Sequence, residues 1–306
     1  MQTAGEGRRA AAGWSDMLQA GPHEMLIAQV TDIHLGFEPG NPAEFNRKRL
    51  DQVLKQLKEM NPKPDLLLAT GDLTEFGDPD SYRRLTNAFK QVDCRVLPMV
   101  GNHDVRLCFA EWFPDVPLAD GFVQYVVDAD PLRIILIDTL EEGRHGGAFC
   151  DVRAAWLNAR LDEDTSRPSI IVMHHPPVEV GIIWMNTHPE EDWVARFRAC
   201  VAGRKNIVAI ICGHLHRAIT TNWEGTTIAI CPATAPQVAL DMSPIDPDKP
   251  DNRPMIIADP PAFALHWWNG SELITHFETA GAHVMLAQFD KNMQDLVRGL
   301  LAERPS

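Results

Sequence analysis

The sequence has no apolar run long enough to cross a membrane. A membrane-spanning helix needs about 20 consecutive apolar residues, and polar or charged side chains interrupt every apolar stretch of this 306-residue chain well before that length. The N-terminal stretch after Arg8 and Arg9 is broken at Ser15 and Asp16, too early for the core of a secretory signal. We therefore expect residues 1–22 to be a mobile extension, no membrane partner and a cytoplasmic location.

The chain is also short of positive charge. It has 28 lysines and arginines against 42 aspartates and glutamates, which gives a formal net charge of -14. A field of this sign repels polyanions, although a cluster of metal ions can override it inside a cleft. We therefore expect a small-molecule partner and no nucleic-acid polymer.

Paired cysteine motifs are absent too. No C-x-x-C pair occurs, and the scattered cysteines lie in apolar settings typical of buried positions. We predict reduced thiols rather than disulfides or zinc ligands. The six residues are Cys94, Cys108, Cys150, Cys200, Cys212 and Cys231.

What is present is the composition of a globular protein with one large core. Hydrophobic residues make up 45% of the chain and charged residues 23%. We predict a single domain over residues 23–280, in which the proline-rich stretch 242–261 forms a loop or cap without regular structure. Residues 281–306 have the amphipathic pattern of a C-terminal helix that could dock on the domain or on a second subunit.

Short aliphatic runs that end abruptly in polar clusters recur along the chain and resemble buried strands. Helical patterns with apolar residues at three- and four-residue spacing lie between them. This alternation predicts a layered α/β domain in which the loops after the strands gather at one rim. The strand runs are Met25–Val30, Asp65–Thr70, Arg95–Val100, Ser169–Met173 and Asn206–Cys212; the helical patterns are Glu44–Met60, Asp80–Gln91, Arg153–Asp164 and Glu191–Gly203.

The rest of the chain looks rich in sheet. Val123–Val127 and Arg133–Asp138 read as a hairpin, and three later stretches add strands with looser periodicity. Those stretches are Thr226–Ile230, Ala262–Trp267 and Leu273–Phe277.

The polar clusters supply seven side chains suited to metal binding. Mixed carboxylate, amide and imidazole donors suit iron, manganese, cobalt or zinc, and two divalent ions could share them. One such residue alone is more often a helix cap or a core histidine, but five clusters that each end a strand reverse that judgement. The seven are Asp32, His34, Asp72, Asn102, His174, His214 and His216.

Spacing indicates how these residues could meet. Residues two apart in an extended chain point to the same side, so we expect Asp32 with His34, and His214 with His216, to act as pairs. Asp72 follows a glycine at a sharp turn, where its carboxylate could bridge two ions.

Five short motifs follow the strand runs in order: Asp32-Ile33-His34, Gly71-Asp72-Leu73-Thr74, Gly101-Asn102-His103-Asp104, His174-His175-Pro176-Pro177 and Gly213-His214-Leu215-His216. As an ordered set they resemble the calcineurin-like metallophosphoesterase superfamily. The resemblance implies a four-layer αββα sandwich of two mixed β-sheets flanked by helices, with two divalent or mixed-valence ions (manganese, iron, zinc or cobalt) at the sheet ends.

The resemblance also implies a role for each motif residue. Asp32, His34, Asp72 and His216 would hold one ion; Asp72, Asn102, His174 and His214 would hold the other. His103 would face the substrate phosphate next to Asn102, and Asp104 would orient it. His175 could contact substrate or could be only a strand-end residue, and both readings stay open. We expect His145 and His188 to be solvated unless they line the cleft, and Asp138 to be structural.

The chemistry follows from the charge of the ions. Two adjacent cations lower the pKa of a bound water, so that metal-bound hydroxide could attack a phosphate ester near neutral pH. His103 could donate a proton to the departing alkoxide. No covalent enzyme intermediate is needed.

Finer motifs favour small phosphodiesters as substrates. The segment Gly71–Gly77 lacks the arginine of protein phosphatases in this superfamily. Three later segments are most similar to bacterial class III cyclic nucleotide phosphodiesterases and glycerophosphodiesterases, which also implies a homodimer. They are Gly181-Ile182 after the His-His-Pro-Pro motif, Ala233–Gln237 and Phe263–Trp268. A promiscuous phosphomonoesterase stays open, as does a catalytically silent binding protein, although the latter should show gaps in the ligand set.

Overall fold

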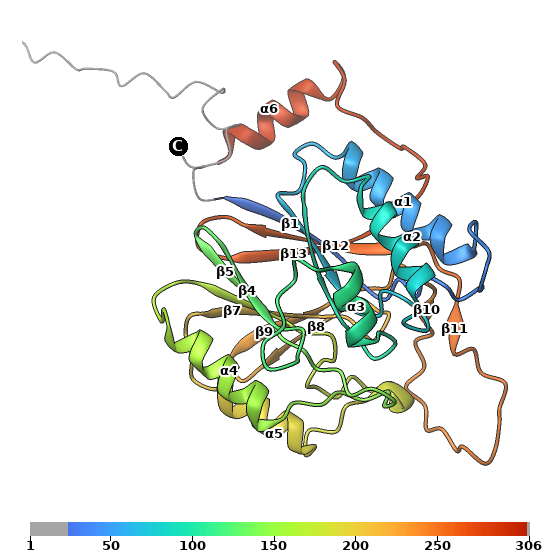
Figure 1. Cartoon of the computed structure of the whole chain (residues 1–306). Helices are drawn as coiled ribbons and strands as arrows, with labels where there is room; N and C mark the ends of the chain where they lie inside the picture. The colour runs from blue at the N-terminus through green and yellow to red at the C-terminus, as the bar shows by residue number, and fades with distance from the viewer. Residues whose placement is uncertain (1–23, 305–306) are drawn as a thin grey trace, which may run out of the picture.

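The computed structural model describes residues 24–304 and has two β-sheets packed face to face with helices on both outer faces (Figure 1). The predicted four-layer αββα sandwich is confirmed. Both sheets are mixed, since parallel and antiparallel pairs occur in each. The prediction for residues 1–22 lies outside the described residues.

The first sheet carries the N-terminal half of the motifs. Its strand order is β13 (Leu273–Thr279), β12 (Ala262–Trp268), β1 (Met25–Val30), β2 (Leu66–Thr70) and β3 (Arg95–Met99). Helices α1 (Phe45–Glu59), α2 (Pro79–Phe89) and α3 (Arg106–Trp112) cover its outer face. Leu50, Val53, Leu54 and Leu57 of α1 pack in one cluster with the strand residue Val30, as their helical spacing predicted.

The second sheet carries the remaining motifs. Its strand order is β4 (Tyr125–Ala129), β5 (Leu132–Leu136), β6 (Ser169–Val172), β7 (Ile207–Cys212), β9 (Thr226–Ile230) and β8 (Ile219–Trp223). Helices α4 (Asp151–Asp162) and α5 (Asp192–Val201) cover its outer face.

A third apolar cluster fills the space between the sheets. Ile27 and Leu68 from the first sheet meet Ile134, Ile170 and Val172 from the second, and all five are fully buried. Strands covered on both faces need apolar residues at successive positions, which explains the unbroken aliphatic runs in the sequence.

Several short elements differ from the prediction. Helix α3, strand β8, the two-residue strand β10 (Gln237–Val238) and the 3₁₀ turn η1 (Ile183–Met185) were not predicted. The expectation of no regular structure over residues 242–261 is wrong at β11 (Ile256–Ile257), which pairs with β10. These isoleucines keep their amide donors between Pro254 and Pro260, so a short antiparallel pair can form there.

Three further features bear on the predictions. All six cysteines are free. Helix α6 (Gln294–Ala302) lies in the predicted C-terminal segment and has no buried residue. Within residues 24–304, no helix is long and apolar enough to cross a membrane.

The α1 cluster gives a test of the fold. Leu54→Ala removes a fully buried side chain from the layer between α1 and the first sheet. We expect it to lower the free energy of unfolding by about 2–5 kcal/mol in chemical denaturation. Lys55→Ala, at the next and largely exposed position, is the matched control. Equal stability of the two variants would contradict this packing.

Candidate metal centre

All seven predicted ligands lie in loops that directly follow strands of the two sheets. The first sheet supplies Asp32 and His34 after β1, Asp72 after β2 and Asn102 after β3. The second sheet supplies the remaining imidazoles, from His174 after β6 and from His214 and His216 after β7. The structure brings the seven side chains together where the two sheets meet.

The backbone at these loops is not extended. Asp32, His34, Asp72, His214 and His216 all have positive φ, between 47° and 72°. The expectation that an extended chain aligns each pair is therefore wrong, although both pairs do converge. A non-glycine residue in this left-handed region costs about 1–2 kcal/mol, and such strain is concentrated at functional sites.

Two glycines let these loops approach each other. A Cβ added at Gly71, where φ is +90°, would lie 2.5 Å from Nδ1 of His174 and 2.8 Å from the backbone nitrogen of Gly101. A Cβ at Gly101 would overlap the backbone nitrogen of Asp72 and lie 2.8 Å from Cε1 of His174. The loops that carry the candidate ligands can therefore assemble only where these positions have no side chain.

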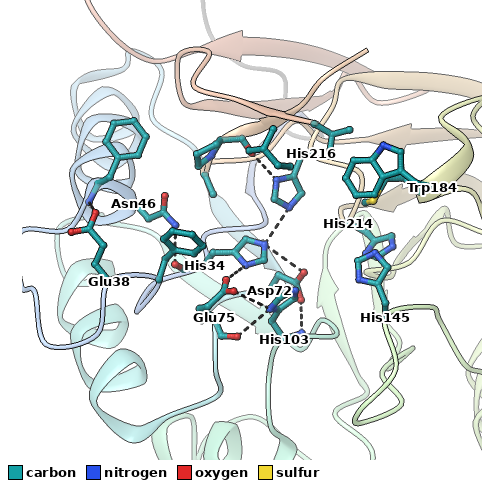
Figure 2. Close-up of a pocket in the computed structure, with 17 residues that line it drawn as sticks. His34, Glu38, Asn46, Asp72, Glu75, His103, His145, Trp184, His214 and His216 are labelled. Atoms are coloured by element: carbon teal, nitrogen blue, oxygen red, sulfur yellow. Dashed lines mark hydrogen bonds and ion pairs between the residues drawn. The ribbon is translucent and has the colours of Figure 1, made fainter. Parts of the chain in front are cut away.

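One half of the cluster lies around His34 and His216. Their Nε2 atoms are 3.1 Å apart. The Nε2 of His34 lies 3.6 Å from Oδ2 of Asp72, and that of His216 lies 3.4 Å from Oδ1 of Asp32 (Figure 2).

The other half lies around His174 and Asn102. The Oδ1 of Asn102 is 3.2 Å from Nε2 of His174 and 3.0 Å from Nδ1 of His214. Oδ2 of Asp72 is 3.3 Å from Nε2 of His174. Asp72 thus faces both halves of the cluster.

Hydrogen bonds on the outer side of three rings fix which nitrogen faces the centre. Nδ1 of His174 donates to the carbonyl of Thr70 at 2.8 Å, and Nδ1 of His216 donates to the carbonyl of Pro236 at 2.7 Å. Nδ1 of His34 donates to the Glu75 carboxylate at 2.7 Å. In the neutral rings every inner Nε2 then carries a lone pair, and these lone pairs face one another and the carboxylates.

This donor set fits divalent cations. Burial disfavours charge on His174, but the carboxylates of Asp72 and Asp32 outweigh it and raise the pKa of this imidazole to about 9. The same competition, with Asp32 as the main partner, raises the pKa of His216. Although burial opposes it, neighbouring histidines hold the pKa of Asp72 well below its usual value. The cluster therefore attracts positive charge, and a metal ion would compete with protons for it.

His103 is held by a residue that the sequence did not reveal. Its backbone nitrogen donates to Oδ1 of Asp72 at 2.8 Å, and its Nδ1 donates to the carbonyl of Glu75 at 3.0 Å. Oε1 of Glu75 lies 3.7 Å from the same Nδ1. Glu75 therefore connects the candidate ligand His34 with His103. Its only sequence signal is its place three residues after Asp72.

Asp104 has different partners from those expected. Its carboxylate accepts hydrogen bonds from the backbone nitrogens of Gly101 and Leu73 at 2.9 and 3.1 Å and from the hydroxyl of Tyr82 at 2.7 Å. Burial and the charge of Asp72 raise the pKa of Asp104 to about 6 in spite of these donors. Asp104 holds the loop that carries His103, and Glu75 contacts the ring.

The remaining candidate residues differ in whether they line the cavity at the site. His175 is fully buried, bonded to the hydroxyl of Thr139 at 2.8 Å, and does not line the cavity at the site. His145, expected to be solvated unless it lined the cleft, does line it, with its ring 4.8 Å from that of His214. His188 is exposed and away from the cavity. Asp138 is buried in an ion pair with Arg106 at 2.8 Å, which agrees with a structural role.

A cavity of about 580 Å³ opens onto the cluster. His34, Asp72, His103, His214 and His216 line it together with His145 (Figure 2). Its other walls come from residues after β1, from the first turn of α1, from Glu75 after β2, from η1 and from the β10 and β11 region.

The close contact of the loops at Gly101 predicts that Gly101→Ala abolishes the site. The added Cβ would collide with the Asp72 backbone and the His174 ring, so we expect loss of bound metal and of turnover, measured by elemental analysis and by hydrolysis of bis-p-nitrophenyl phosphate. Gly299→Ala, in open space on α6, is the control. A Gly101→Ala protein with wild-type metal content would show that the loops are not this close.

The Glu75 contacts predict a role in metal binding. Glu75→Ala removes the acceptor for Nδ1 of His34, so we expect affinity for added manganese or zinc to fall by about 10–100-fold, measured by calorimetry. Glu59→Ala, at the exposed end of α1, is the control. Unchanged affinity in Glu75→Ala would count against this orienting role.

Comparison with known proteins identifies the family of this chain. Residues 25–218 match the model of the calcineurin-like phosphoesterase family. The chain is 28% identical over 267 residues to a probable glycerophosphodiester phosphodiesterase of Arcobacter nitrofigilis, with 84% of this chain and 94% of that protein covered. It is 33% identical over 210 residues to a probable cyclic nucleotide phosphodiesterase of Rhodopseudomonas palustris, with 66% and 73% covered.

The fold is shared with more distant proteins. The purple acid phosphatase PPD1 from yellow lupin seeds superposes with a TM-score of 0.60 at 12% identity, covering 88% of this chain and 58% of that one. The family match spans all the strands that carry candidate ligands. The chain therefore belongs to the calcineurin-like phosphoesterase family.

Proposed function

We propose that the protein is a phosphodiesterase that uses two divalent cations to hydrolyse small phosphodiesters, either 3',5'-cyclic nucleotides or glycerophosphodiesters. The observation that supports this proposal is the convergence of seven candidate ligands, with Asp72 facing both halves of the cluster, beside a cavity that four of them line. The names of the two relatives support both substrate classes.

The two halves of the cluster suggest the two ion sites. Asp32, His34, Asp72 and His216 would hold one ion; Asp72, Asn102, His174 and His214 would hold the other. When bound, the ions would supply positive charge for the phosphoryl oxygens and would lower the pKa of a water. Mixed oxygen and nitrogen donors suit manganese, iron, zinc or cobalt.

His103 is the candidate proton donor. Its Nδ1 proton is committed to the carbonyl of Glu75, and the Glu75 carboxylate places negative charge beside the ring. With Nδ1 bonded in this way, Nε2 is the nitrogen left to give a proton to the departing alkoxide. Asp104 contributes by holding the loop, and Asn102 lies between His174 and His214, where it can also meet the phosphate.

We also propose a homodimer in the cytoplasm, built on one catalytic domain over residues 23–280 with a C-terminal segment after it. The free cysteines support a reducing compartment. Leu296 and Leu300 on α6 are more than half exposed and offer an apolar face for a second subunit.

A substrate panel tests the function. We expect the manganese-loaded protein to hydrolyse bis-p-nitrophenyl phosphate and at least one of 3',5'-cAMP, 2',3'-cAMP and glycerophosphoethanolamine, and His103→Asn to lower turnover by about 10²–10⁴-fold. The products measured are p-nitrophenol from the nitrophenyl esters, AMP from the cyclic nucleotides, and the phosphomonoester and alcohol from glycerophosphoethanolamine. Cleavage of p-nitrophenyl phosphate alone would identify a phosphomonoesterase, and no cleavage of any ester would indicate a silent binding protein.

A further inference from the structure

Asn46, in the first turn of α1, makes a hydrogen bond through its side-chain nitrogen but none to the described residues through its side-chain oxygen. The residue is 5% exposed, and its side-chain Nδ2 donates to the backbone carbonyl of His34 at 2.9 Å. Because a carbonyl only accepts, this bond fixes the orientation of the amide. Its Oδ1 makes no hydrogen bond to any residue within 24–304, and Asn46 lines the cavity (Figure 2).

This oxygen is not among the fully buried polar atoms that lack a partner, so it keeps access to the cavity and offers a free acceptor to a ligand bound there. The bond to the backbone of His34 keeps Asn46 next to the metal centre. Its Oδ1 can therefore meet a donor on the part of the substrate close to the ester, such as a hydroxyl on a neighbouring carbon of the alcohol.

The rest of the cavity indicates what that alcohol carries. Phe37, Phe45, Trp184 and Ile256 form apolar walls, and Figure 2 shows Trp184 on the other side of His216 from Asn46. Phe37 is 63% exposed and Phe45 46%, so both rings offer open faces. Flat uncharged groups pack well on such rings.

The charge of the cavity lining further limits which alcohol group of the substrate can bind. No lysine or arginine of the described residues lines the cavity, and its acidic side chains other than Asp72 are Glu38 and Glu75. A second phosphate on the alcohol would be repelled, whereas a neutral ring system would not. Glycerol has a suitable hydroxyl but no flat face for the aromatic walls.

We propose that Asn46 is a specificity-determining residue that accepts a hydrogen bond from a sugar hydroxyl next to the scissile ester, and that the preferred alcohol is a ribose bearing a flat base. This inference rests on the phosphodiesterase function proposed above. It predicts that the enzyme distinguishes ribonucleoside from 2'-deoxyribonucleoside 3',5'-cyclic monophosphates.

The test compares kcat/KM for 3',5'-cAMP and 2'-deoxy-3',5'-cAMP. We expect wild-type protein to prefer the ribonucleotide by about tenfold, the effect of one hydrogen bond. In Asn46→Ala this ratio should fall toward one. Asn222→Ala, an exposed asparagine on β8, should keep the wild-type ratio.

Other outcomes overturn the proposal. If Asn46→Ala lowers both rates by the same factor, Asn46 only supports the fold of the loop. Equal wild-type rates on the two nucleotides, or a higher kcat/KM for glycerophosphoethanolamine than for cAMP, would also refute it, and neither measurement needs a variant. In these cases hydrolysis of bis-p-nitrophenyl phosphate would leave the phosphodiesterase function intact, whereas its absence would refute that function itself.

Discussion

Imidazole nitrogens and carboxylates crowded around one buried space are the constraint on which this structure depends. The inner nitrogens of His34 and His216 are 3.1 Å apart, with two buried carboxylates within 3.6 Å of them. Such an arrangement repels itself unless positive charge occupies the space. The loops, the glycines and the outer hydrogen bonds can all be understood as ways of holding this arrangement in place.

Holding it has a structural cost. Five of the seven candidate ligands have left-handed backbone, which the surrounding packing must compensate. The two buried sheets provide that support, because each ligand stands within a few residues of a strand whose side chains are fully covered. A site on rigid strand ends keeps its geometry better than one on long loops.

Much of this arrangement could be predicted from the sequence, because buried strands leave a strong signal. Runs such as Leu66–Thr70 are apolar at nearly every position and stop at the motif residue. Strand β8 left no such signal, since its sequence ITTNW is polar and largely exposed. Helix α3 spans only seven residues, too few for a periodic pattern to stand out.

Within the site, the motif residues could be predicted and their supports could not. Glu75 and Asn46 each make a hydrogen bond to His34, and both lie well away from His34 in the sequence. No local spacing of residues encodes such contacts. His145 reaches the cavity on a glycine-containing loop whose path depends on packing against His175. The extended-chain explanation for the Asp-x-His and His-x-His pairs was wrong because spacing alone does not show where a strand ends.

The order of strands in the first sheet has a consequence for biosynthesis. Strand β1, which leads to the first motif, pairs on one side with β2 and on the other with β12, more than 230 residues later. During translation from the N-terminus, one edge of β1 must stay open until most of the polypeptide has left the ribosome. Contacts so distant in sequence also slow folding, so the nascent chain has a prolonged period in which an unpaired strand edge invites aggregation.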